Sequence, residues 1–176
     1  MNTIGLKKVK RLKVVKMIER SFVLIKPDGV ERGLLGEIIK RFENSGLKIV
    51  AMKMLWVDEK FAKEHYKVHA KKTFFKELVG VIKGGPIVVM VIEGVHAVQN
   101  VRKLVGPTSP HIAQPGTIRG DFAHVSMDYA NKMKIVGKNM IHAADSLKTA
   151  KEEIKLWFGK EEIHSYESVH DKHVLK

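Results

Sequence analysis

The sequence contains no cysteine, which excludes disulfide bonds and thiolate-bound metal sites. It also lacks an apolar run near the roughly 18 residues that a membrane-spanning helix needs. The longest such run, PIVVMVIEG at residues 86–94, predicts a single buried strand. We therefore expect a soluble protein with no membrane contact, and 176 residues suffice for one domain with a substantial hydrophobic core.

Both common glycine-rich phosphate-binding loops are missing. The chain has no G-x-x-x-x-G-K-[ST], and no G-x-G-x-x-G stands between a predicted strand and a predicted helix. If the protein binds nucleotides, it does so by other means. The strand at residues 86–94 also has no aromatic side chain. Because an RNA-recognition module displays aromatics on its third strand, that function is disfavoured.

Acidic residues are scarce relative to basic ones. The chain has 32 Lys and Arg against 19 Asp and Glu, a net charge of +13 at pH 7. Such a charge favours polyanionic partners such as nucleic acid or phosphorylated ligands. Nearly half of the excess lies in residues 1–16, which contain no acid and these basic residues: Lys7, Lys8, Lys10, Arg11, Lys13 and Lys16.

Residues 1–16 admit two interpretations. They lack the long apolar stretch and the small-residue cleavage site of a secretory signal, so their charge fits a nucleic-acid-binding arm or an organelle-targeting peptide. The simpler interpretation, which we favour, is a solvated extension, or a start codon misread upstream of Met17. We expect a basic extension at residues 1–18 and one domain at residues 19–176.

The rest of the sequence alternates strand and helix patterns. Asp58 and Thr73 are expected to cap helices. Residues 106–122 are rich in Pro and Gly and long for a connection, which predicts a functional loop without regular structure. The pattern indicates one α/β or α+β sandwich. We expect strands at residues 21–25, 48–57 and 86–94, and helices at about 31–44, 58–69, 73–83, 95–105 and 146–157.

His142 lies in an apolar run, KNMIHAADSL at residues 138–147, just before a helix that Asp145 or Ser146 can cap. A single histidine beside apolar residues is more often a packing group than a catalyst. The chemistry of this one therefore depends on what the following helix brings near it.

That helix carries a candidate partner for His142. Glu153 lies on the flank of the predicted apolar stripe, about 80° from its centre at roughly 100° per residue. From there it can turn back toward His142 and fix the tautomer, which makes the free ring nitrogen more nucleophilic. The alternative is a solvated surface glutamate. Glu152 fits that alternative better, because Lys148 and Lys155 lie about one turn on either side of it.

Several segments occur together in one order. They are SFVLIKPDGVERGLLGEIIKRFENSG, EHY, FF followed by Leu78, PGTIRGDF, and NMIHAADS followed by EEIKLWF. In these motifs, from about Arg20 to about Tyr166, the chain resembles the nucleoside diphosphate kinase family, and its archaeal members more than its animal ones. The resemblance implies a ferredoxin-like α+β sandwich, with a four-stranded antiparallel sheet (βαββαβ) and helices on one face.

The resemblance also implies an activity and a site. The family transfers the γ-phosphate of a nucleoside triphosphate to a nucleoside diphosphate by a ping-pong route through a phosphohistidine. Mg²⁺ is bound through the nucleotide phosphates. His142 matches the nucleophile and Glu153 the carboxylate that orients it. The remaining matches are Lys26 and Tyr66 near the transferred phosphate, Arg102, Thr108 and Arg119 as phosphate ligands, Asn139 at the ribose, and Phe74 stacked on the base with Leu78 beneath it.

Two features depart from the family pattern. Residues 123–136, AHVSMDYANKMKIV, include an insertion of about ten residues, which leaves the second contact to the base open between Val125 and Val136. Ala144 stands where the family usually has a serine whose hydroxyl supports the catalytic glutamate. Loss of that hydrogen bond costs about 0.5–1.5 kcal/mol, roughly tenfold in rate at most, so activity should survive.

The family assembles as hexamers or tetramers, and the extended C-terminal segment favours the hexamer. A cytoplasmic location follows from the same resemblance. The rival hypothesis is a non-catalytic, basic nucleic-acid-binding protein that keeps the scaffold. The complete set of matched residues favours the enzyme, because a scaffold freed from catalysis need not retain it.

Overall fold

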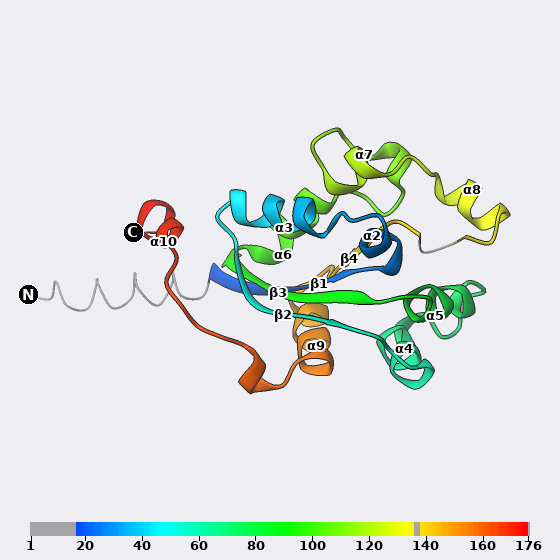
Figure 1. Cartoon of the computed structure of the whole chain (residues 1–176), viewed down its shortest axis with the longest axis horizontal. Helices are drawn as coiled ribbons and strands as arrows, with labels where there is room; N and C mark the ends of the chain where they lie inside the picture. The colour runs from blue at the N-terminus through cyan, green and yellow to red at the C-terminus, as the bar shows by residue number, and fades with distance from the viewer. Residues whose placement is uncertain (1–16, 136–137, 176) are drawn as a thin grey trace, which may run out of the picture.

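The computed structural model describes residues 17–135 and 138–175. Their centre is one antiparallel sheet with strand order β2-β3-β1-β4 (Figure 1). This order, with helices between the strands, confirms the ferredoxin-like α+β fold that the sequence predicts. The strands are β1 (Ile18–Ile25), β2 (Lys48–Leu55), β3 (Ile87–Val95) and β4 (Ile141–Ala143).

The central strand β1 divides the core into two halves. Its side chains alternate between the faces of the sheet, with Phe22 and Leu24 in one apolar cluster and Val23 and Ile25 in the other. All four are fully buried. The short strand β4 pairs with the end of β1 and sets His142 directly opposite Leu24.

Helices cover both faces of this sheet. The helices α3 (Leu35–Asn44) and α6 (Ala97–Val105) contribute to one apolar cluster, as expected. The expectation that helices lie on one face only was incomplete, because both faces of β1 are apolar. The second face packs against α4 (Glu59–His65), α5 (Phe75–Lys83) and α9 (Leu147–Trp157). Figure 1 shows α4 and α9 on the side of the sheet opposite α3.

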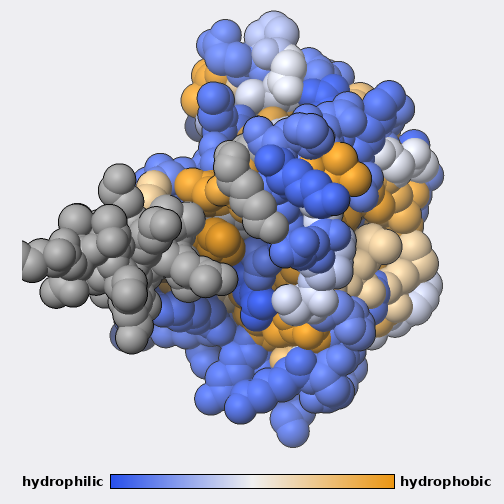
Figure 2. Space-filling view, turned by 90° about the vertical axis from the view of Figure 1, so that its left-hand side faces the viewer, coloured by the Kyte–Doolittle hydropathy of each residue, from blue (hydrophilic) through white to orange (hydrophobic). Residues whose placement is uncertain are grey.

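Several short helices and 3₁₀ turns lie between and after the main elements. The helix α8 lies in the inserted segment, and α10 lies near the C-terminus. Figure 2 shows the end of the molecule where β1 begins, and its surface is largely hydrophilic with small separate hydrophobic groups. The elements are α2 (Pro27–Glu31), α7 (Ile118–Phe122), α8 (Met127–Lys132) and α10 (Val169–Val174), with the 3₁₀ turns η1 (Lys67–His69), η2 (Pro110–Ile112) and η3 (Lys160–Glu162).

Several local predictions need correction. β1 begins at Ile18, three residues before the predicted start, because it continues its pairing with β3 up to Val95. Thr73 does not cap α5, which starts at Phe75. The segment 106–122 is not wholly irregular, since η2 and α7 lie in it. The hydroxyl of Thr117 accepts a hydrogen bond from the backbone N–H of Gly120 and so starts α7.

Two predicted caps are confirmed. Asp58 accepts a hydrogen bond from the backbone N–H of Phe61 at the start of α4. Of the two candidates before α9, the cap is Ser146, whose hydroxyl accepts from the N–H of Thr149. No helix in residues 17–135 or 138–175 combines the length and apolar character needed to cross a membrane.

The Ser146 cap provides a test of how α9 is held. We expect Ser146→Ala to destabilise the fold by about 1 kcal/mol, because one N–H of the first turn loses its acceptor. For a chain of this size, this lowers the melting temperature by about 2–4 °C. Ser146→Asp keeps an acceptor and should melt close to wild type in circular dichroism. Equal melting of both variants would contradict the cap.

Candidate active site

A cavity of about 570 Å³ opens where β1 ends and β4 begins. Every site residue that the sequence predicts lines it, although these residues are spread along the chain from Lys26 to Glu153. The fold therefore brings the whole predicted set together. The residues are Lys26, Tyr66, Phe74, Leu78, Arg102, Thr108, Arg119, Asn139, His142 and Glu153.

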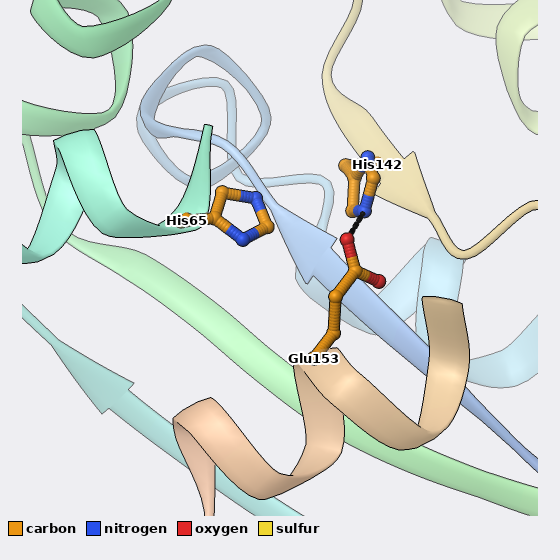
Figure 3. Close-up of side chains that lie close together, drawn as sticks. All are labelled: His65, His142 and Glu153. Atoms are coloured by element: carbon orange, nitrogen blue, oxygen red, sulfur yellow. Dashed lines mark hydrogen bonds and ion pairs between the residues drawn. The ribbon is translucent and has the colours of Figure 1, made fainter. Parts of the chain in front are cut away.

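His142 and Glu153 form a hydrogen-bonded pair in this cavity (Figure 3). The Nε2 atom of His142, on β4, lies 2.7 Å from Oε1 of Glu153, on α9. The side chains are only 26% and 12% exposed, respectively. The helical geometry that favoured Glu153 over Glu152 is thus confirmed. The other ring nitrogen, Nδ1, points away from the carboxylate.

The pair determines which nitrogen of His142 can react. An ionised carboxylate only accepts hydrogen bonds, so Nε2 of the neutral ring carries the proton and Nδ1 keeps its lone pair. Burial, together with the charges of Lys26, Arg119 and Arg102, lowers the pKa of His142 to about 3. The imidazole is therefore neutral at neutral pH. Burial raises the pKa of Glu153 to about 7.

Lys26, Arg102 and Arg119 form the cationic wall of the cavity. A chain of hydrogen bonds holds Lys26 in place. Nζ of Lys26 donates to Oδ1 of Asn139 at 2.7 Å, and Nδ2 of Asn139 donates to the carbonyl of Thr108 at 2.8 Å. Burial and the charge of Arg119 lower the pKa of Lys26 to about 7, while Asp28 acts in the opposite direction. The amino group of Lys26 is thus held at a fixed place in the cavity that His142 also lines.

Arg119 is more deeply buried than a phosphate ligand needs to be. It is 5% exposed, and its guanidinium donates to the carbonyls of Gly106 at 2.9 Å, Ile141 at 2.6 Å and Asn139 at 3.4 Å. Burial lowers its pKa to about 10. Arg119 therefore fastens the loop after α6 to the segment before His142, while its charge contributes to the cavity.

The apolar wall consists of residues from α4, η1 and α5. Phe74 is half-buried and Leu78 is buried, as a stacking side chain and its support require. Tyr66 is 6% exposed, and burial raises its pKa, so the phenol is neutral. Val68 from η1 also lines the cavity.

His65 and Met127 are among the cavity residues that sequence reasoning missed. His65, on α4, lies with its ring edge-on to that of His142 at a centroid distance of 5.2 Å. Met127 of the inserted helix α8 also lines the cavity, whereas Val125 is not among the described lining residues. Val136, the other candidate for the second base contact, lies outside the described residues. His65 could have been noticed within the EHY motif, but Met127 carried no signal.

The arrangement has the parts needed for phosphate transfer to histidine. A neutral imidazole with one free nitrogen lines a cavity that also contains the cationic side chains of Lys26, Arg102 and Arg119 and an apolar wall with the aromatic ring of Phe74. Fixed cations can neutralise a polyphosphate without a glycine-rich loop. Such a site can accept a phosphoryl group from a nucleotide and pass it on.

Comparisons with known proteins agree with this chemistry. A family model described as nucleoside diphosphate kinase matches residues 19–163. The nucleoside diphosphate kinase of Archaeoglobus fulgidus is 52% identical over 150 residues, which cover 85% of this chain and 93% of that protein. The one of Macrococcus caseolyticus is 51% identical, over 86% of this chain and 96% of that protein.

Solved structures lead to the same family. A transition-state mimic of the Borrelia burgdorferi nucleoside diphosphate kinase with bound vanadate and ADP superposes with a TM-score of 0.85 at 41% identity, over 89% of this chain and 96% of that one. The Halobacterium salinarum enzyme in complex with CDP gives 0.79 at 40% identity, over 89% and 97%. This chain therefore belongs to the nucleoside diphosphate kinase family, whose members transfer a phosphate group from a nucleoside triphosphate to a nucleoside diphosphate.

Proposed function

We propose that His142 is the nucleophile of this phosphate transfer and that Glu153 orients it. In the first half-reaction, Nδ1 attacks the γ-phosphorus of a nucleoside triphosphate, and the bond from that phosphorus to the bridging oxygen breaks. The nucleoside diphosphate leaves. In the second half-reaction, a terminal oxygen of another diphosphate attacks the phosphohistidine, the P–N bond breaks, and His142 is restored. The 2.7 Å bond to Glu153, which leaves Nδ1 free, carries this proposal.

The cationic wall is proposed to bind the polyphosphate. Arg102, Thr108 and Arg119 contact the phosphates, and Lys26 and Tyr66 lie near the group in transfer. Charge-assisted hydrogen bonds of this kind gain strength as negative charge shifts in the transition state. An anionic substrate also favours the protonated form of Lys26, whose pKa burial has lowered to about 7.

The nucleoside is proposed to lie at the outer end of the cavity. Asn139 contacts the ribose, and Phe74 stacks on the base with Leu78 beneath it. The half-buried side chain of Phe74 and the buried side chain of Leu78 support this arrangement. A stacking contact uses only the π-face, which every base has. Loose base selection follows.

Mg²⁺ is the proposed cofactor, bound through the nucleotide phosphates. The described residues offer one cluster with metal-ligand spacing, His65, His142 and Glu153, and it is rich in nitrogen. Mg²⁺ prefers oxygen ligands and commonly binds substrate phosphates with few protein contacts. The site therefore fits a metal that arrives with the nucleotide. There the ion would neutralise charge on the phosphates.

We also propose that the chain forms a homo-oligomer, a hexamer rather than a tetramer. The edge strand β2 ends in exposed apolar side chains, with Met52 54%, Met54 55% and Trp56 68% exposed. An apolar edge of this kind is an assembly surface or an aggregation hazard. Self-association would bury it. A cytoplasmic location is proposed on the same grounds as the activity.

Residues 1–16 lie outside the described part of the chain, and for them we propose a solvated basic extension with weak, sequence-independent affinity for nucleic acid. The folded domain is proposed to occupy residues 19–176, although β1 already begins at Ile18. The six basic residues of the extension support the affinity.

The first prediction tests the nucleophile. Incubation of the full chain with γ-³²P-ATP and Mg²⁺ should place an acid-labile label on the wild type and none on His142→Ala. The control variant His164→Ala removes an exposed histidine later in the sequence than His142, and it should take up the label as the wild type does. Well-folded wild-type protein that stays unlabelled would falsify the assignment.

The second prediction concerns base selection. ATP, GTP, CTP and UTP should all act as donors, with kcat/KM values within roughly two orders of magnitude, because stacking energies differ among bases by only a few kcal/mol. Phe74→Ala should lower kcat/KM for all four by about 10- to 100-fold, and Phe74→Tyr should restore most of it. Strict use of one base by the wild type would refute the stacking role.

The third prediction separates the extension from the active site. Deletion of residues 1–16 should leave phosphate transfer unchanged, because no proposed site residue lies there. It should also remove most nucleic-acid binding, which in the full chain should fall steeply with salt, by about 0.9 in log–log slope for each phosphate neutralised. Steady-state kinetics and fluorescence anisotropy at two salt concentrations measure both. Nucleic-acid binding that survives deletion and high salt would favour the rival, nucleic-acid-binding function.

A further inference from the structure

His65 is a buried histidine whose tautomer is fixed by its surroundings. His65 is the last residue of α4 and is only 7% exposed. The indole N–H of Trp157, on α9, donates to Nδ1 of His65 at 3.2 Å. Burial, followed by the neighbouring His142, lowers the pKa of His65 to about 3, so its ring is neutral. Because Nδ1 is an acceptor, the single ring proton lies on Nε2.

A second buried polar group near His65 also lacks a partner. The Nε2 atom of His65 and the Oε2 atom of Glu153 are both buried without a hydrogen-bonding partner. One is a donor and the other an acceptor. Ligand atoms of His65, His142 and Glu153 all lie within 4.8 Å of one another (Figure 3). Buried polar groups rarely stay unpaired, because each one costs free energy.

The same three side chains invite interpretation as a metal site, but the proton positions oppose it. A metal would need a lone pair on Nε2 of His65. Because Nδ1 of His65 accepts the N–H of Trp157, the ring proton lies on Nε2, and that atom has no lone pair to offer. Nε2 of His142 is already bonded to Glu153. The positive charges of Lys26, Arg119 and Arg102 act on His142 from the same cavity and would repel a cation.

We propose that His65 is a positioning residue that donates its Nε2–H to the Glu153 carboxylate and so holds that carboxylate as the acceptor for His142. Contact between the two groups would satisfy both buried atoms. The carboxylate would then accept one bond from each histidine. Trp157 fixes the donor, His65 fixes the carboxylate, and the carboxylate keeps the lone pair of His142 on Nδ1. This inference rests on the proposed role of His142.

A donor at His65 would counteract the tendency of burial to protonate Glu153 in the His142–Glu153 pair. Burial favours the protonated form of Glu153, and a protonated carboxyl no longer favours the reactive tautomer of His142. A donor such as His65 Nε2–H stabilises the ionised form. The other charged groups that act on the pair are Asp145, Glu152, Lys26, Arg102 and Arg119, and none of the variants below alters them.

Two substitutions at His65 test the donor. His65→Phe keeps a ring of similar size without the N–H, and we expect kcat to fall by about 10- to 100-fold for every nucleotide, because a hydrogen bond to a charged group is lost. The acidic limb of the kcat profile should move to higher pH, since Glu153 loses the donor that favours its ionised form. His65→Gln places an amide N–H near the same point and should recover most of the rate and the limb.

A third variant tests the tautomer from the opposite side. Trp157→Phe removes the N–H that holds the proton on Nε2 of His65, so the acidic limb should move in the same direction as in His65→Phe. Tyr129→Phe, an aromatic substitution at a 53% exposed position that does not line the cavity, is the control and should leave the profile unchanged. In ¹⁵N-histidine NMR, His142 of the wild type should be the Nε2–H tautomer, and His65→Phe should give a mixture.

The outcomes distinguish positioning from packing. A merely structural role predicts equal losses in His65→Phe and His65→Gln with an unmoved acidic limb, and that result would overturn the proposal. Unchanged kcat in His65→Phe would overturn it as well. If the wild type itself carries no label on His142, the proposed function fails, and the labelling experiment shows this separately before any His65 variant is compared.

Discussion

The hydrogen bond between His142 and Glu153 is the interaction on which the rest of the site depends. Its two ends stand on different elements, a three-residue strand and a helix. It exists only while β4 pairs with β1 and α9 packs against the same strand through Ala150 and Trp157, which lie in the cluster with Phe22. The buried centre of the sheet therefore sets the distance between His142 and Glu153.

The cationic wall carries a cost that the substrate offsets. Lys26 and Arg119 are each 5% exposed. Burial lowers the pKa of both, and a neighbouring cation adds to the effect, Arg119 for Lys26 and Arg102 for Arg119. Such a wall is preorganised, because carbonyls and the Asn139 amide already fix its donors. In the proposed complex a polyphosphate would supply the missing negative charge, and fixed side chains would do what a glycine-rich loop does in other nucleotide-binding proteins.

Sequence reasoning succeeded where the signal is local and failed where it depends on the tertiary fold. Helical geometry singled out Glu153, and family motifs supplied the other lining residues. The packing of helices on both faces was not foreseen, because it depends on how β1 shares its side chains between two cores. His65 becomes significant only through Trp157, 92 positions later in the chain. Met127 belongs to an inserted segment for which the motifs give no guide.

The turn before His142 shows how the fold holds the site at some conformational cost. Met140 is buried and has a φ of 66°, a left-handed backbone that a side chain with a Cβ rarely adopts. Its N–H donates to Asp28 Oδ2, and its carbonyl accepts from the backbone N–H of Lys26. A Cβ at Gly29 would lie 3.1 Å from that carbonyl, so glycine allows the close approach. Lys26 and the first turn of α2 thus fix the segment that carries Asn139 and His142, through the backbone N–H of Lys26 and the side chain of Asp28.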